Sequence, residues 1–284
     1  MALPQDHSDL DKIIDQLGRD IEQRRLEMPL LPDVAAEVLS STLDDKANAA
    51  RLAELIQQDQ ALATHLLRIV NSPAFRGSTE IVALQQALAR LGMERIREIA
   101  LSVSLQGTLY TPGPYDALLK VSWQCALRCA LWSKEVARQA RKNVEVAYLS
   151  GLLHNIGEPL LLNHLSKLPT PPDLDTVEEV LERLAGAAGT ALVEEWSLPS
   201  SVALTIRYLA HFQEAKNAQD LVAVVASGLA FAQIDAEDFA DEECELLSEM
   251  LCLESMQHLN FYPDDVEQLL SLNDQIELTV DSMR

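Results

Sequence analysis

The stretch Gln58–Phe75, QDQALATHLLRIVNSPAF, carries the clearest information about the fold. Asp59 stands where a helix N-cap would accept a backbone hydrogen bond. Apolar residues then recur at helical spacing from Leu62 to Val70 and form one stripe. Asn71-Ser72-Pro73 follows, and the proline disfavours helical conformation in the residue before it. The segment therefore predicts one amphipathic helix with a defined start and end.

The helical pattern continues on both sides of this segment, and alternating runs of β-branched residues are absent from the chain. The sequence therefore predicts an all-α protein. Gly92 suits the position after a helix end that requires a positive φ. The expected helices span residues 10–21, 33–43, 48–57, 59–70, 82–91, 94–105, 118–136, 177–195, 200–212 and 220–234, with one more beginning at 145 and an ordered helix within 235–249.

Thr111-Pro112-Gly113-Pro114 is the strongest break in the first half of the chain. We expect two packed helical subdomains to meet there, an N-terminal one over residues 1–111 and a second over 112–216. Residues 217–284 hold 16 acidic residues and one basic residue, Arg284. Because such a charge run is usually a solvated face, we expect acidic C-terminal helices packed on the core.

Charge and composition exclude several classes of partner and location. The 284 residues include 22 Lys and Arg against 44 Asp and Glu, a net charge of −22, and no local basic patch stands out. Nucleic acid and anionic membrane surfaces are therefore not expected as partners. The longest near-apolar stretch, 221–234, is too short to cross the ~30 Å hydrocarbon core of a bilayer. Without a secretory signal pattern or a CxxC pair, we expect a cytoplasmic protein with reduced thiols.

The segment Gly151–Gly157, GLLHNIG, holds the sharpest chemical candidate, His154-Asn155. A His followed by Asp at the end of an apolar helix would place an imidazole and a carboxylate side by side as ligands for one metal. Asn carries no charge and is a poorer ligand for a divalent ion. We therefore favour a His that is satisfied by hydrogen bonds in or near the core.

The four cysteines are interpreted as packing residues. Cys125 and Cys129 lie four apart on one helix, which places their Cβ atoms too far apart for a disulfide. A zinc site made by both thiolates and His154 is the alternative. Cys244 and Cys252 are eight apart, again on one helical face, and are also expected in the core.

The remaining histidines and the common catalytic motifs give no support for an enzyme. The chain contains no GxSxG, GxxxxGK[ST], HExxH or GxGxxG sequence. His65 and His211 lack a Ser or Cys arranged as a nucleophile beside a base, so we interpret both as structural.

Taken together, several segments resemble the bacterial HDOD family, the HD-related output domain. Gln58–Phe75 is similar to the family's first motif, and Ile81–Gly92 matches its pattern of an Ile, a helix and an Ala-x3-Leu-Gly stop. Gly151–Gly157 resembles the GLLHDIG of HD proteins, and Glu195–Pro199 also agrees with the family. The resemblance covers about residues 22–235.

The resemblance implies that the metal site of catalytic HD phosphohydrolases is vestigial here. Those enzymes hold their metal with a first His, a His-Asp pair and a later Asp. Aligning Trp123 with the family places Cys125 at the first His, while His154 is retained and Asn155 replaces the Asp. No residue is assigned to the final Asp. We therefore expect no catalytic residue, no bound metal and no cofactor.

Because the HDOD family is generally regarded as non-catalytic and regulatory, the resemblance implies a bacterial signal-transduction protein that acts as a scaffold. Its expected partner is another signalling protein or domain. Two alternatives remain open. One is a metal-dependent phosphohydrolase of nucleotides or cyclic dinucleotides, and the other is a small-ligand sensor that uses the vestigial cavity between Cys125 and His154.

An interaction surface at Asn71, Ser72 and Phe75 is a further hypothesis, because these residues end a helix where the resemblance is strongest. The interpretation that we favour is that they only terminate the helix and pack locally.

Overall fold

The protein is described by a computed structural model over residues 7–42, 49–75, 77, 79–234 and 243–283. It is 78% helical, and no strand occurs among the described residues, which confirms the all-α class. The helices are α1 (His7–Glu22), α2 (Asp33–Thr42), α3 (Ala49–Gln58), α4 (Gln60–Val70), α5 (Leu84–Leu109), α6 (Asp116–Gln139), α7 (Val144–Leu153), α8 (Gly157–Ser166), α9 (Leu174–Glu195), α10 (Ser200–Tyr208), the 3-10 helix η1 (Leu209–Ala218), α11 (Gln219–Ala232), α13 (Glu243–Cys252), α14 (Glu254–His258), α15 (Pro263–Leu270) and α16 (Asn273–Ser282).

The helix expected after Asp59 is α4, and its start is confirmed in atomic detail. The Asp59 carboxylate accepts a hydrogen bond from the Leu62 backbone N–H at 3.0 Å. Leu62, Leu66 and Val70 are buried on one face, as their spacing predicts. The helix ends at Asn71, where the sequence places its stop.

The break expected at Gly92 is also confirmed. Gly92 has φ 78° inside α5, so the backbone leaves helical geometry there and resumes it in the next residues. A residue with a Cβ would be strained in this conformation. The second part of α5 runs to Leu109, one turn further than expected, because Ile96, Leu105 and Leu109 continue its buried face.

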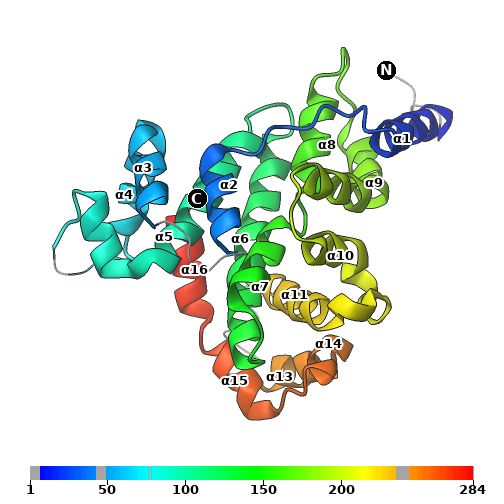
Figure 1. Ribbon diagram of the computed structural model, residues 1–284. Coiled ribbons are helices and arrows are strands. Elements are labelled where there is room, and N and C mark those ends of the chain that lie inside the picture. The colour runs from blue at the N-terminus through cyan, green and yellow to red at the C-terminus, as the bar shows by residue number, and fades with distance from the viewer. Residues whose placement is uncertain (1–6, 43–48, 76, 78, 235–242, 284) are drawn as a thin grey trace.

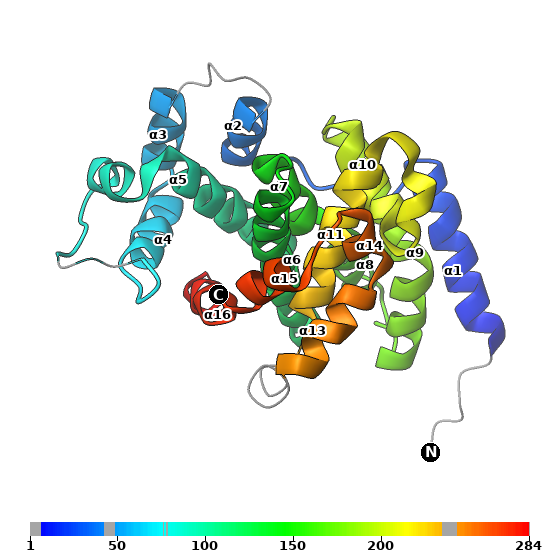
Figure 2. The same cartoon turned by 90° about the horizontal axis from the view of Figure 1, so that it is seen from below.

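Figures 1 and 2 show how the helices are arranged. The centre is formed by α6, which packs against α7 and α11. On one side, α3 and α4 lie against α5; on the other, α8 packs on α9 and α9 on α10. Helix α16 and its neighbour α15 return to α6 near the end of the chain. The first helix, α1, packs on α9 and not beside α3 and α4, which follow it in sequence.

The expected break at residues 111–114 separates α5 from α6. Helices on either side of this break are in contact elsewhere, because α5 touches α8. Across the other expected limit, at 216, α11 packs along α6. The proposed domain limits at 111 and 216 therefore stay predictions.

Two expectations about individual segments are corrected. The α-helix expected over 200–212 ends at Tyr208 and continues as η1, in which His211 and Lys216 have non-helical angles. Cys252 is exposed and not in the core, whereas Cys129 is buried as expected. The expected helix within 235–249 lies partly outside the described residues, and so does the side chain of Cys244. Its described part is helical in α13.

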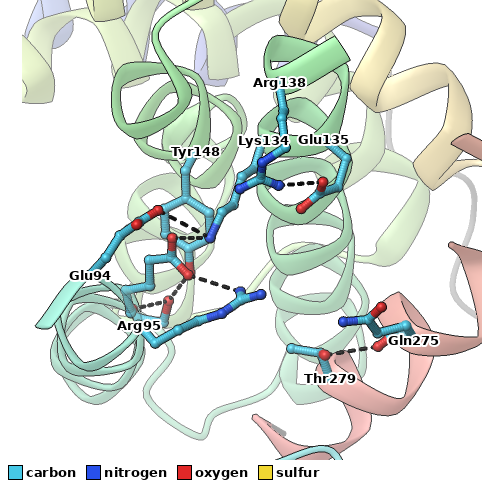
Figure 3. Close-up of polar contacts among 10 residues, drawn as sticks. Glu94, Arg95, Lys134, Glu135, Arg138, Tyr148, Gln275 and Thr279 are labelled. Carbon is cyan, nitrogen blue, oxygen red and sulfur yellow. Dashed lines mark hydrogen bonds and ion pairs between the residues drawn. The ribbon is translucent and has the colours of Figure 1, made fainter. Parts of the chain in front are cut away.

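A buried ion pair joins α5 to α6. Lys134 is only 2% exposed and contacts the carboxylate of Glu98, and its Nζ lies 3.6 Å from the Glu94 carboxylate. Beside it, the hydroxyls of Ser102 and Tyr148 are 2.8 Å apart and connect α5 to α7. Figure 3 shows Lys134 reaching from α6 towards Glu94, with Tyr148 alongside. Among the described helices, none is long and apolar enough to cross a membrane.

Candidate functional site

The structure brings Cys125 and His154 together from different helices. Cys125 lies on α6, and His154 stands at the C-terminal end of α7, 29 residues later. The Cys125 Sγ and the His154 Nε2 are 3.9 Å apart. The two residues that the resemblance aligns with the first and second ligand positions are therefore neighbours in space.

His154 is held as a neutral side chain. Its Nδ1 lies 2.7 Å from the carbonyl oxygen of Gly151, so Nδ1 carries the proton and donates a hydrogen bond to that carbonyl. Nε2 is then left as an acceptor facing the Cys125 thiol. Burial lowers the pKa of His154 to about 4, an effect that the hydrogen bond to Gly151 only partly opposes.

Asn155 uses its amide as a hydrogen-bond donor inside the protein. It is 8% exposed, and its Nδ2 donates to the backbone carbonyl of Ser122 at 2.9 Å and to the Ser122 hydroxyl at 3.0 Å. The same nitrogen lies 3.4 Å from a carboxylate oxygen of Glu158. An ionised carboxylate at this position could make none of these donations. Asn155 therefore suits the protein's own packing and not the place of an acidic ligand.

Two further ionisable side chains, Glu158 and Tyr110, belong to the cluster around His154. Neither was predicted from the sequence. Burial raises the pKa of Glu158, against the hydrogen bonds from Ser122 and Asn155, so this carboxyl is biased towards its neutral form. The Tyr110 ring packs against Trp123 with ring centres 4.9 Å apart, and burial raises the pKa of its hydroxyl. The sequence could have indicated Glu158, because it follows Asn155 by three residues, in the first turn of α8. No sequence pattern indicates Tyr110, which a break separates from α6.

The donor set does not fit a hydrolytic metal centre. Burial and the nearby Glu158 raise the pKa of the Cys125 thiol to about 11, so the thiolate that would bind a metal is disfavoured. His154 offers one nitrogen, and Asn155 offers an amide oxygen that is buried without a hydrogen-bond partner. Within the part of the chain that the structure describes, no three His, Cys, Asp or Glu residues are grouped to hold a metal.

The side chains at the end of α4 are engaged internally. The Asn71 amide donates to the carbonyls of Leu67 and Ile81 at 2.9 and 2.7 Å and accepts from the Ile81 N–H at 2.8 Å. Phe75 is half-buried and packs on the core, and the Ser72 hydroxyl is buried. This geometry agrees with the local-packing interpretation, and an interaction surface there stays a prediction.

Comparison with known proteins agrees with this fold. The sequence profile of the HDOD domain matches residues 28–212. An uncharacterized protein of Treponema pallidum is 28% identical over 207 residues, which cover 68% of this chain and 39% of that protein. The cyclic di-GMP phosphodiesterase CdgJ of Vibrio cholerae is 29% identical over 160 residues, 56% of this chain and 36% of the relative. The chain thus spans less than two fifths of the length of these relatives.

Solved structures with the same fold include three proteins of low sequence identity. An HDOD domain protein of unknown function from Geobacter sulfurreducens has a TM-score of 0.73 at 20% identity, with 98% of this chain and 99% of that chain covered. A provisionally named phosphohydrolase from Shewanella amazonensis has a TM-score of 0.70 at 20% identity, with 94% and 98% covered. A provisionally named signal transduction protein from Marinobacter aquaeolei has a TM-score of 0.64 at 21% identity, with 99% and 67% covered.

Proposed function

The chain belongs to the HDOD family, and we propose that it is a non-catalytic signalling protein that acts by binding another signalling protein or domain. The observation that carries the proposal is the amide of Asn155, which donates to Ser122 and offers a metal only an uncharged oxygen in place of a carboxylate. The naming of the Marinobacter relative as a signal transduction protein agrees with a regulatory role.

Hydrolysis would require a metal that binds several protein ligands and still activates a water molecule by lowering its pKa. A protonated thiol at Cys125, a single imidazole nitrogen at His154 and the amide of Asn155 are a poor set for Mg²⁺, Mn²⁺ or Fe. The phosphodiesterase activity named for CdgJ belongs to a protein of which this chain matches 36%. It therefore gives no separate support for hydrolysis by this chain.

The test is a hydrolysis assay of bis(p-nitrophenyl) phosphate and of a cyclic dinucleotide, in the presence of Mn²⁺. We expect no turnover by the wild type above the level of its His154→Ala variant. The double variant Cys125→His with Asn155→Asp restores two ligand types and shows whether these positions can support the reaction. If the wild type turns over either substrate and His154→Ala does not, the scaffold proposal is wrong and the protein is a metal-dependent phosphohydrolase.

A further inference from the structure

A hollow of about 520 Å³ lies between α3, α4 and the residues that lead into α5. Figures 1 and 2 show α3 and α4 at one end of the molecule, on the side opposite α1 and α9. The floor of the hollow includes the apolar side chains of Ile56, Leu67 and Leu84. None of the described residues that line it is an Asp, Glu, Lys, Arg or His.

The absence of charge distinguishes this hollow from four others in the described structure. Each of those includes at least one charged side chain, such as Lys167, Asp59, Arg95 and Glu98, respectively. A charged group pressed into the hollow between α3 and α4 would lose its hydration and meet no counter-charge from the lining residues. The surface that covers this hollow is therefore expected to be uncharged as well.

Glutamine side chains surround the apolar floor. Gln57, Gln60 and Gln85 are exposed, and their amides make no hydrogen bond within the part of the chain that the structure describes. A glutamine amide carries both a donor and an acceptor, so two copies of the same amide can pair with each other. Two ionised carboxylates cannot do this. The rim of the hollow is therefore chemically complementary to itself.

Val82 gives the same surface a projecting apolar group. It lines the hollow, and 70% of the residue is exposed. Its backbone N–H donates to the Gln86 side chain at 2.9 Å, which holds Val82 to the first turn of α5. In a two-fold contact, each residue of one copy meets the same partner residue on the other copy. A surface that carries both a projecting side chain and a hollow can satisfy this requirement.

The charge of the chain favours a second copy at this surface over a charged partner. The net charge of −22 opposes association wherever acidic faces meet, and residues 243–283 alone hold ten acidic residues and no Lys or Arg. A contact through the hollow places no carboxylate of its lining against another. A basic partner would be attracted to the acidic helices and would gain no ion pair in the hollow.

From these observations we propose that this hollow is the contact surface of a reversible homodimer. Val82 of each copy enters the hollow of the other, and the glutamine amides pair across the two-fold axis. A contact limited to one hollow and its rim belongs to the small, transient class of interfaces. The proposal does not depend on the absence of hydrolysis or on the identity of the signalling partner.

The experiment is sedimentation velocity of the purified full chain, from 1 to 500 μM. We expect a monomer–dimer equilibrium with a dissociation constant of about 100 μM or below in 0.15 M NaCl. The dimer should be tighter in 0.5 M than in 0.05 M NaCl, because salt screens the repulsion between two acidic chains. An interface made of ion pairs would show the opposite dependence on salt.

Two variants place a charge in the hollow, and one matched variant places it elsewhere. Val82→Glu and the isosteric Gln60→Glu should each weaken the dimer by about tenfold or more, since the charge enters twice in a symmetric contact. Val121 on α6 is 65% exposed and does not line the hollow, so Val121→Glu should dimerise as the wild type does.

Four results would overturn the proposal. They are a wild type that stays monomeric at 500 μM, which would leave a different polypeptide as the occupant, a dimer of unchanged strength in Val82→Glu, an equal loss in Val121→Glu, and a dimer that salt dissociates.

Discussion

The imidazole of His154 has one nitrogen bonded to the Gly151 carbonyl and the other facing the Cys125 thiol. Burial lowers its folded-state pKa to about 4 from an ordinary value of 6.5. Between these pH values the unfolded chain binds a proton at His154 and the folded chain does not. Folding stability from this residue is therefore complete above pH 6.5 and falls, by about 3 kcal/mol in all, as the pH drops to 4.

Urea unfolding at several pH values checks this prediction against the variant His154→Gln, which cannot titrate. Glu158, whose raised pKa has the opposite sign, is present in both proteins and cancels in the comparison. The wild type should lose more stability than the variant between pH 6.5 and 4. Parallel pH curves for the two proteins would contradict the buried, neutral state of His154.

Gly157 shows a close approach that its motif does not reveal. A Cβ at Gly157 would lie 1.9 Å from the Ala185 carbonyl oxygen and 2.7 Å from the Gly189 nitrogen, both backbone atoms of α9. Backbone atoms of a packed helix cannot move aside cheaply, so Gly157→Ala should destabilise the protein by about 3 kcal/mol or more. Gly186→Ala, with nothing near its Cβ, should be neutral or stabilising. Urea midpoints that are equal for the two variants would refute the contact.

At the scale of the site, the sequence could place Cys125, His154 and Asn155 together only through the resemblance, since spacing along a chain does not define distance in space. Glu158 could have been predicted as a site residue, because it follows Asn155 by three residues in an apolar helix. Tyr110 and Ser122 could not have been predicted, because their roles arise from the packing of the α5–α6 connection against α6 and α8.

At the scale of the elements, helix ends with a local cause were predictable, as Asp59 at the start of α4 and Gly92 inside α5 show. Helix α8 is not among the helices expected from the sequence. It begins with Gly157 and has Pro159 in its first turn, where a proline is tolerated. The packing of α1 on α9 also could not be predicted from the sequence, because an amphipathic stripe does not identify the surface that covers it.

The buried ion pair between Lys134 and Glu98 is predicted to hold α5 on α6. Lys134→Met would leave the Glu98 carboxylate, 12% exposed, without its closest cation, although Arg95 remains 3.2 Å away. We expect Lys134→Met to lower the free energy of unfolding by about 3 kcal/mol, because breaking a buried pair leaves an uncompensated charge. Replacing both partners, as Lys134→Met with Glu98→Leu, should cost less than the single change.

The control for this prediction is Arg138→Met on the same helix. Arg138 is half exposed and pairs with Glu135, so its loss should cost less than about 1 kcal/mol. Thermal and urea unfolding measure the loss of stability in each of the three variants. A Lys134→Met protein as stable as Arg138→Met would show that the pair does not hold α5 on α6.

Across the whole molecule, charge is distributed unevenly along the chain. Residues 84–142, which include α5 and α6, hold nine basic and four acidic residues, although the chain as a whole is strongly acidic. The acidic C-terminal segment returns to these helices, with Arg128 2.6 Å from Glu277 and Lys142 2.6 Å from Asp220. The acidic run is therefore partly engaged with the core and is not only a solvated face.

We interpret the site around His154 as a hydrogen-bonded cluster and not as a metal centre. Isothermal titration of the purified wild type with Mn²⁺ at pH 7.5 tests it most directly, with His154→Ala as the control for other sites and Cys125→His/Asn155→Asp as the variant that regains ligand types. We expect the wild type to bind no more Mn²⁺ than His154→Ala does, and to bind it less tightly than the double variant. One equivalent of Mn²⁺ bound by the wild type and lost in His154→Ala would contradict it.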